Sequence, residues 1–126
     1  MQPIDLTLAL KATDGDVELL KDVIEAFLEE YPVLLAQLEP AILAGDRAVV
    51  QRASHTIKGT LRLFGDVPAK GFAECLESMG QSGDLKHAAE IVDSLKVALA
   101  SLRMQLMNSM KDPFGPMGTI SVTEIR

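Results

Sequence analysis

The stretch that decides the fold is "DRAVVQRASHTIKGTLRLFG", residues 46–65. Its apolar residues recur every three or four positions, which is the spacing of one face of an α-helix. They are Val50, Ala53, Ile57, Leu61 and Phe64. Asp46 is a good N-cap residue, and Gly65 is a residue at which helices commonly stop. The stretch therefore predicts an amphipathic helix over residues 46–64.

The preceding stretch, residues 16–44, has the same pattern. Asp16 is the expected N-cap, and Glu18 suits the first turn. The apolar stripe consists of Leu20, Ile24, Phe27, Tyr31, Leu34, Leu35, Leu38 and Ile42. Because proline removes a helical hydrogen bond, Pro32 and Pro40 predict a kink or a break at one or both positions.

Two more helices are expected after Gly65. Asp66 can cap the first, Pro68 is tolerated in its first turn, and its apolar residues are Ala69, Phe72, Ala73 and Leu76. A tight connection at residues 81–84 then leads into a last helix. Its stripe is Ala88, Val92, Leu95, Leu99, Leu102 and Leu106.

These patterns predict an all-α fold. A short helix over residues 5–12 comes first, and no segment before residue 111 is typical of a strand. Four amphipathic helices with short connections favour an antiparallel four-helix bundle, here with a short extra N-terminal helix. We expect residues 1–110 to form the bundle. Residues 111–126 contain Pro and Gly and form a C-terminal tail, which is either disordered or docked on the bundle or a neighbour.

The composition of the chain argues against several classes of function. A chain of 126 residues suits one domain, and a net charge of −6 argues against nucleic-acid binding. One cysteine, Cys75, excludes an intramolecular disulfide and a multi-cysteine metal site. No apolar run has membrane-spanning length, and the N-terminus lacks the features of a signal peptide. We expect a soluble cytoplasmic protein with no nucleic-acid or membrane partner.

The charge is unevenly distributed along the chain. Residues 1–45 contain nine acidic residues and two lysines. Residues 46–64 contain one acidic residue, Asp46, against Arg47, Arg52, Lys58 and Arg62. Such a basic segment either binds a small anion or an acidic partner surface, or is simply a solvated helix face.

His55 is predicted to point away from the core. At about 100° per residue, it lies roughly 160° from the mean direction of the apolar stripe. Gly59 follows one turn later, about 40° round the helix, and Arg62 lies about 20° from His55. Lys58 is about 60° away, and Ala48 lies on the same side two turns earlier. The histidine should therefore be exposed, with little bulk beside it along the helix axis.

This arrangement suits nucleophilic chemistry at phosphorus. Neutral imidazole is a good nucleophile near pH 7, and its second nitrogen can be held by a hydrogen bond. Gly59 costs about 1 kcal/mol in a helix interior, which is understandable if a partner's active site must close over His55. The ammonium of Lys58 could steady phosphoryl oxygens. The alternative is an ordinary surface histidine beside a glycine without function.

The pattern resembles the histidine-containing phosphotransfer (HPt) family. The residues that carry the resemblance are Ser54, His55, Ile57, Lys58, Gly59, Thr60, Phe64 and Gly65, then Leu76 and Glu77. The acidic, leucine-rich stretch over residues 13–46 is also similar to the helix that precedes the histidine in this family. The resemblance covers about residues 5–108.

The resemblance implies a four-helix bundle that relays a phosphoryl group without a nucleotide site. His55 would accept the group, Lys58 would help to hold it, and Glu77 would accept a hydrogen bond from the other imidazole nitrogen. The donor would be a receiver-domain aspartyl phosphate or a sensor histidine kinase, and the acceptor another response-regulator receiver. Mg²⁺ would belong to the receiver, so this chain needs no cofactor or metal of its own. The surface contacted by the partner would include Ala48, Gln51, Arg52, Gly59 and Arg62.

Some residues depart from the family pattern. Leu61, Arg62 and Asp66 stand where the family usually has small residues, which leaves the choice of partner open. Glu77 could be a plain surface acid.

The remaining polar candidates are not expected to carry chemistry. His87, in the first turn of the last helix, should be solvent-exposed, and Cys75 should be structural. No ATP-binding motif is present, so the chain is not expected to be a kinase. The rival hypothesis is a helical module that binds a receiver or another signalling partner without being phosphorylated.

Overall fold

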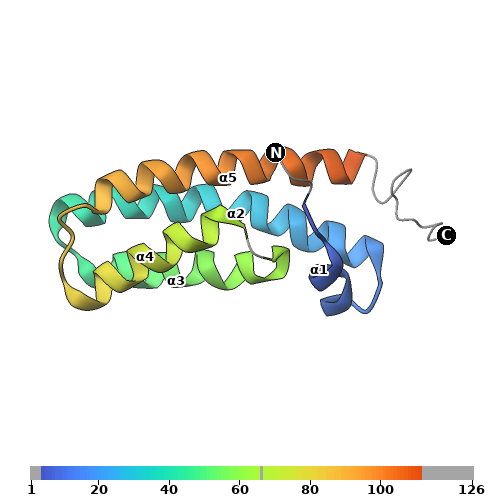
Figure 1. Cartoon of the computed structure of the whole chain (residues 1–126), viewed down its shortest axis with the longest axis horizontal. Helices are drawn as coiled ribbons and strands as arrows, with labels where there is room; N and C mark the ends of the chain where they lie inside the picture. Colours follow the sequence, from blue (N-terminus) through green and yellow to red (C-terminus); the bar gives the residue numbers. More distant parts are fainter. Residues whose placement is uncertain (1–3, 66, 112–126) are drawn as a thin grey trace.

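The computed structural model describes residues 4–65 and 67–111. Within them lie α1 (Thr7–Ala12), α2 (Val17–Ala44), α3 (Arg47–Leu61), the short 3₁₀ helix η1 (Arg62–Phe64), α4 (Pro68–Ser82) and α5 (Ala88–Lys111). Helices α2 to α5 lie lengthwise beside one another, and α1 covers one end (Figure 1). Helix α3 packs against α2 and α4, α5 packs against the same two helices, and α1 packs on η1. The predicted all-α bundle with a short N-terminal helix is confirmed.

Helix α2 runs without interruption through both of its prolines. Asp16 accepts a hydrogen bond from the Leu19 amide at 3.1 Å, and the helix ends at Gly45, whose φ of 71° is left-handed. Both Pro32 and Pro40 lie inside the helix. A proline removes one backbone hydrogen bond, but packed residues occur on both sides of each proline. The helix is therefore not broken at either proline, and the predicted alternative, a kink, stays a prediction.

The other helix ends differ from expectation in two places. The stretch over residues 46–64 is helical throughout, but its last turn tightens into η1 before Gly65. Helix α5 begins at Ala88 and not directly after the connection at residues 81–84. The residues before it form a turn, in which the Lys86 amide donates to the Asp84 carboxylate at 3.2 Å. The sequence analysis placed His87 in the first turn of the last helix, which is wrong, because His87 precedes α5. Its side chain is exposed as expected.

Helix α4 begins without a side-chain cap among the described residues. The residue that precedes its first turn is Val67, whose side chain makes no capping hydrogen bond. The predicted cap, Asp66, lies outside the described residues, as does the tail after Lys111. At the other end α4 stops at Gly83, with a left-handed φ of 84°.

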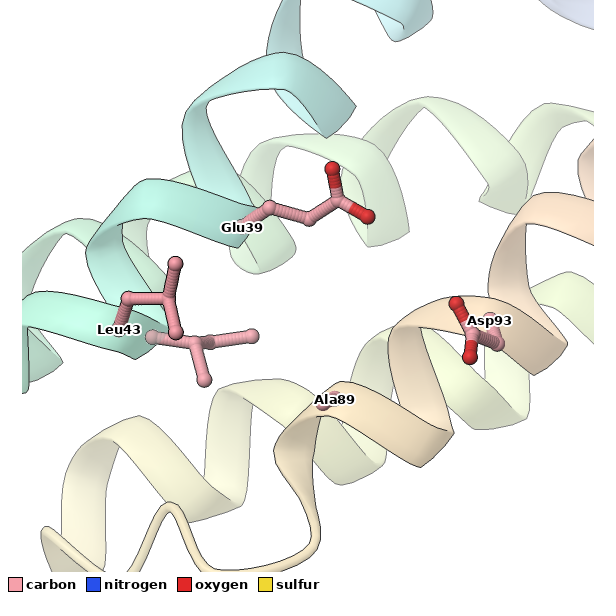
Figure 2. A pocket seen from close by; sticks show the side chains of 5 residues that line it. Glu39, Leu43, Ala89 and Asp93 are labelled. Atoms are coloured by element: carbon pink, nitrogen blue, oxygen red, sulfur yellow. The ribbon is translucent and has the colours of Figure 1, made fainter.

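Helices α2 and α5 leave a shallow pocket between them. Its volume is about 280 Å³, and its lining residues come from these two helices: Glu39, Ile42, Leu43, Ala89 and Asp93 (Figure 2). Leu43 is 90% exposed there. An ion pair between Glu39 and Lys96 joins the same two helices.

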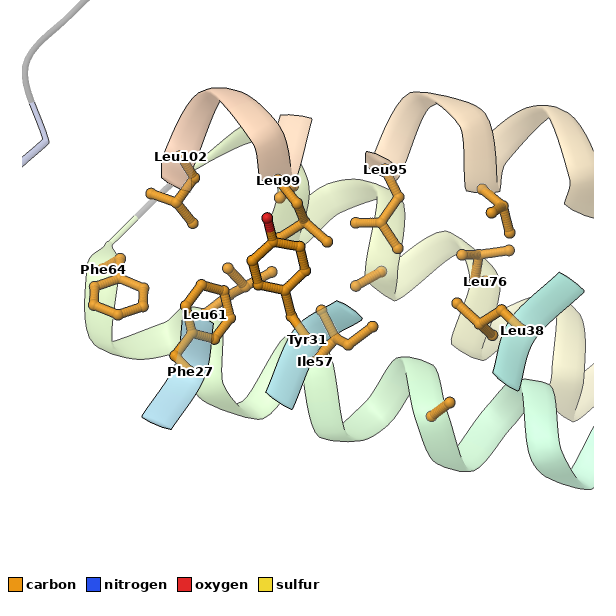
Figure 3. Close-up of a cluster of buried hydrophobic side chains, with 14 of the residues drawn as sticks. Phe27, Tyr31, Leu38, Ile57, Leu61, Phe64, Leu76, Leu95, Leu99 and Leu102 are labelled. Carbon is orange, nitrogen blue, oxygen red and sulfur yellow. The ribbon is translucent and has the colours of Figure 1, made fainter. Parts of the chain in front are cut away.

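The core lies along the axis of the bundle. Every predicted stripe residue of α3, η1 and α5 is buried, whereas Leu34, Leu35 and Ile42 of α2 and Phe72 of α4 are half-buried. Side chains from α2, α3 and α5 point toward one another in Figure 3. At one end the ring of Phe27 lies 5.2 Å from Tyr31 and 5.4 Å from Phe64, measured between centroids. This core fixes which face of α3 is left for solvent.

Candidate functional site

His55 lies on the outer face of α3. Its neighbours along the stripe, Ala53 and Ile57, are each 1% exposed, whereas the His55 side chain is 63% exposed. The helix turns about 100° per residue, so burial of the stripe forces residue 55 outward. The predicted direction of the histidine is confirmed.

One carboxylate, supplied by α4, meets two side chains of α3. Glu77 Oε2 lies 2.7 Å from His55 Nδ1, and Glu77 Oε1 lies 2.6 Å from Lys58 Nζ. Only 12% of the Glu77 side chain and 14% of the Lys58 side chain are exposed. The contact between the histidine and the acidic residue, which the resemblance implied, is present. The contact between Lys58 and Glu77 had not been predicted.

This geometry distinguishes the two imidazole nitrogens. An ionised carboxylate can only accept hydrogen bonds, so Nδ1 is the nitrogen that carries the hydrogen in neutral His55. The lone pair then lies on Nε2. Among the described residues no hydrogen bond engages Nε2, and the side chain is open to solvent. The nitrogen with the lone pair is therefore accessible.

Glu77 is held in its charged form. The hydrogen bond from Lys58 is the main cause that lowers the pKa of the Glu77 carboxyl, and the hydrogen bond from His55 lowers it further, against the opposing effect of burial. A carboxylate with two charge-assisted partners stays ionised at neutral pH. It can therefore balance positive charge that develops on the imidazole ring.

The surroundings of His55 are open. A Cβ placed on Gly59 would have no other atom within 4 Å, apart from its own helix and neighbours. Ala48, Arg52 and Arg62 are exposed, and Gln51 is half-buried. Gly59 and these four residues were expected to contact a partner. Their exposure agrees with that expectation without testing it.

Two structural features of this region were missed from the sequence. Gly80 packs so closely on α3 that a Cβ there would lie 2.7 Å from the backbone nitrogen of Gln51. Ser54, beside the histidine, is fully buried, and its hydroxyl has no hydrogen-bond partner among the described residues. A glycine on the predicted inner side of a helix is the signal that could have suggested the close approach.

The structure gives little support for a functional role of the other polar residues considered from the sequence. In the described part of the chain, no group of three or more His, Cys, Asp or Glu side chains is placed to hold a metal ion. Cys75 is half-buried in α4. The exposed His87 has Glu90 at 3.7 Å as a partner. Of the helices described, none combines the length and the apolar character needed to cross a membrane.

Comparison with known proteins identifies the class. The model of the Hpt domain family matches residues 22–105, which include α3, α4 and the whole His55 site. The chain therefore belongs to the Hpt domain family, whose members are phosphotransfer proteins of phosphorelays and not kinase domains.

A solved structure supports the fold. The chain is similar to the histidine-containing phosphotransfer protein B (HptB) from Pseudomonas aeruginosa PAO1, with a TM-score of 0.78. The match covers 86% of this chain and 95% of that protein, at 19% sequence identity. At this identity the likeness shows the shared fold. No curated protein matches the chain.

Proposed function

We propose that His55 is the phosphoryl acceptor of this Hpt domain. It takes the group from a receiver-domain aspartyl phosphate, or from a sensor histidine kinase, and passes it to the aspartate of another receiver. The observation that carries the proposal is the exposed imidazole whose Nδ1 is hydrogen-bonded to an ionised carboxylate at 2.7 Å.

The transfer step follows from this geometry. The Nε2 lone pair attacks phosphorus and forms the P–N bond, while the P–O bond to the donor aspartate breaks and the aspartate leaves as a carboxylate with the electron pair. Nδ1 keeps its proton, so positive charge develops on the ring. Glu77, hydrogen-bonded to Nδ1, stabilises that charge. The reverse step, onto a second aspartate, uses the same contacts.

The partner supplies the rest of the chemistry. The receiver brings Mg²⁺ and most of the electrostatic stabilisation of the phosphoryl oxygens. The exposed residues Arg52, Gly59 and Arg62 form part of the surface that the receiver contacts, together with Ala48 and Gln51. Gly59 leaves room for that contact because no side chain projects there.

The test is phosphorus NMR on the purified protein after treatment with a small phosphoramidate donor. We expect one acid-labile, base-stable phosphohistidine signal that is absent from His55→Gln, a variant expected to keep the fold because the side chain is mostly solvent-exposed. A folded wild-type protein without the signal would refute the proposal and favour the module that binds partners without phosphorylation. A variant that fails to fold would show that His55 is structural.

A further inference from the structure

Helix α5 carries a stripe of exposed apolar side chains on the side turned away from the core. Val97 is 72% exposed, Met104 is 67% exposed, Met107 is 44% exposed, and Ala100 is exposed between them. These four residues, the α5 stripe, follow one another at intervals of three and four positions and therefore share one face of the helix. Apolar side chains grouped in this way on a protein surface commonly mark a site that binds another protein.

The α5 stripe borders helix α2. The two helices pack side by side in antiparallel directions (Figure 1), and Glu39 of α2 is ion-paired with Lys96 of α5. At 1.5 Å per residue, Glu29 lies about 15 Å along α2 from Glu39. Met104 and Met107 lie about 12 Å and about 16 Å from Lys96 in the same direction along α5. The two methionines are therefore level with Glu29.

The outer face of α2 is acidic at this level. Four exposed acidic residues recur there every three or four positions and therefore share one face of the helix. These residues, the α2 acids, are Glu18, Asp22, Glu25 and Glu29. Residues 17–30 and 97–107, which include the α2 acids and the α5 stripe, contain two basic residues, Lys21 and Arg103. The α5 stripe thus lies beside a surface of net negative charge.

This α2–α5 surface is on the opposite side of the bundle from His55. Helices α3 and α5 both pack on α2 and α4, so α3 and α5 occupy diagonal positions. His55 and Glu77 meet where α3 packs on α4. A partner bound along α2 and α5 would therefore leave the imidazole of His55 open to a receiver.

We infer that the α2–α5 surface docks a basic amphipathic helix of a partner protein, with its apolar side on the α5 stripe and its lysines or arginines beside the α2 acids. Amphipathic helices commonly bind through apolar residues spaced three and four positions apart. Methionine side chains are flexible and adapt to the shape of a partner. Opposite charge across the interface fixes the orientation of the bound helix and speeds its association.

Charge favours such a partner over two other occupants of the surface. A second copy of this chain would bring a second set of the α2 acids to the interface, and like charges repel. The end of the chain, residues 112–126, contains Asp112, Glu124 and one basic residue, Arg126. It therefore has no excess of positive charge to match the α2 acids.

The first experiment uses a synthetic helical peptide of about 15 residues, with leucine on one face and lysine on the other. It is titrated into the full chain, labelled for NMR at backbone amides and methyl groups. We expect shifts concentrated at the methyl groups of Val97, Met104 and Met107 and at the amides of Glu25 and Glu29. The same peptide with glutamate in place of lysine should not bind. His55→Gln should bind the lysine peptide as the wild type does, so the result is independent of phosphorylation.

The apolar contact is tested by Met104→Gln. Loss of a buried apolar anchor should weaken binding of the lysine peptide at least about fivefold. Leu43→Gln is the control, because Leu43 is 90% exposed but lies at the other end of α2. It should change the affinity less than about twofold. Equal effects of the two substitutions would overturn the inference.

The charge contact is tested by combining Glu25→Gln with Glu29→Gln. This variant should bind the lysine peptide at least about fivefold more weakly at low salt, and the difference should shrink in about 0.5 M salt. Glu74→Gln combined with Glu90→Gln removes two other exposed acids and gives the same net charge. It should bind nearly as the wild type does. An equal loss in both double variants would show attraction by net charge alone and would overturn the inference.

Three further outcomes would also overturn it. The lysine peptide could fail to bind, or could shift the residues around His55 in place of the α2–α5 surface. Sedimentation could show a dimer of the chain that Met104→Gln dissociates, in which case a second copy covers the surface. Nuclear Overhauser effects between the Met104 methyl group and residues 112–126 would show that the chain's own end covers it.

Discussion

Gly80 of α4 and Gln51 of α3 touch through their backbones: a Cβ on Gly80 would lie 2.7 Å from the Gln51 nitrogen and 2.9 Å from the Arg47 carbonyl oxygen. Glu77 is one turn before Gly80, and His55 is one turn after Gln51. The two helices therefore approach each other closely one turn from the point where Glu77 reaches His55. A side chain at Gly80 would have to push the helices apart beside that hydrogen bond.

Replacing Gly80 should disturb both packing and the site. Because the clashing atoms are backbone, Gly80→Ala is expected to destabilise the fold by about 1–3 kcal/mol. Gly71→Ala is the matched control in the same helix, since its Cβ would meet no atom within 4 Å, and it should be stabilising by up to about 1 kcal/mol. Urea unfolding measures both. Equal stability of the two variants would contradict the close-contact explanation.

Gly59 allows a separate test of access to His55. Gly59→Leu should leave the free energy of unfolding equal to that of the wild type or raise it by up to about 1 kcal/mol, because glycine is a poor helix former. Transfer from a cognate phosphorylated receiver should slow at least about tenfold, a barrier change of only about 1.4 kcal/mol. Phosphorylation by the small phosphoramidate serves as the control and should change much less. A wild-type rate with the receiver would mean that no partner surface approaches this position.

Ser54 offers a stabilising substitution. Its buried hydroxyl has no hydrogen-bond partner among the described residues, and burying such a group costs about 1–3 kcal/mol. Ser54→Ala is therefore expected to raise the free energy of unfolding by about 1 kcal/mol. Ser109→Ala is a useful comparison, because that hydroxyl donates to the Gln105 carbonyl at 3.0 Å and its loss should not stabilise. A less stable Ser54→Ala protein would reveal a partner for the hydroxyl.

The Glu77 contacts predict a pH dependence of stability. Lys58 and, to a smaller extent, His55 keep the pKa of Glu77 below the ordinary value of 4.5. A carboxyl whose pKa is lower in the folded chain adds stability that is complete above the unfolded-state pKa and is lost as the pH falls through the folded-state pKa. The advantage of the wild type over Glu77→Gln in unfolding free energy should therefore shrink from about pH 5 downward. A difference that stays constant from neutral to acid pH would show that the carboxylate is not stabilised by these contacts.

The features that depend on one helix at a time were predictable. The stripes of α3 and α5 are buried as predicted because apolar residues at helical spacing must face the core. The same rule places His55 on the outside. Gly45, Gly65 and Gly83 mark the ends of helices because each has a left-handed or otherwise positive φ.

The features that the sequence analysis missed or predicted wrongly depend on contacts between helices or on competing local interactions. Of the predicted kink or break at Pro32 and Pro40, the break is absent, since packing along α2 outweighs the two missing hydrogen bonds, and the kink stays a prediction. The pairing of Lys58 with Glu77 joins two helices, and no single-helix pattern contains it. Asp84 draws the Lys86 amide into a turn and delays the start of α5.

The aromatic cluster at the end of the bundle gives the protein an optical property. The chain has no tryptophan and a single tyrosine, Tyr31, which is 7% exposed and packed against Phe27. Tyrosine emission, which no tryptophan obscures, therefore comes from one ring in the α2 core. Substitutions at His55 or Lys58 on α3, or at Glu77 on α4, leave this fluorophore in place, so unfolding of every site variant can be followed with the same built-in signal.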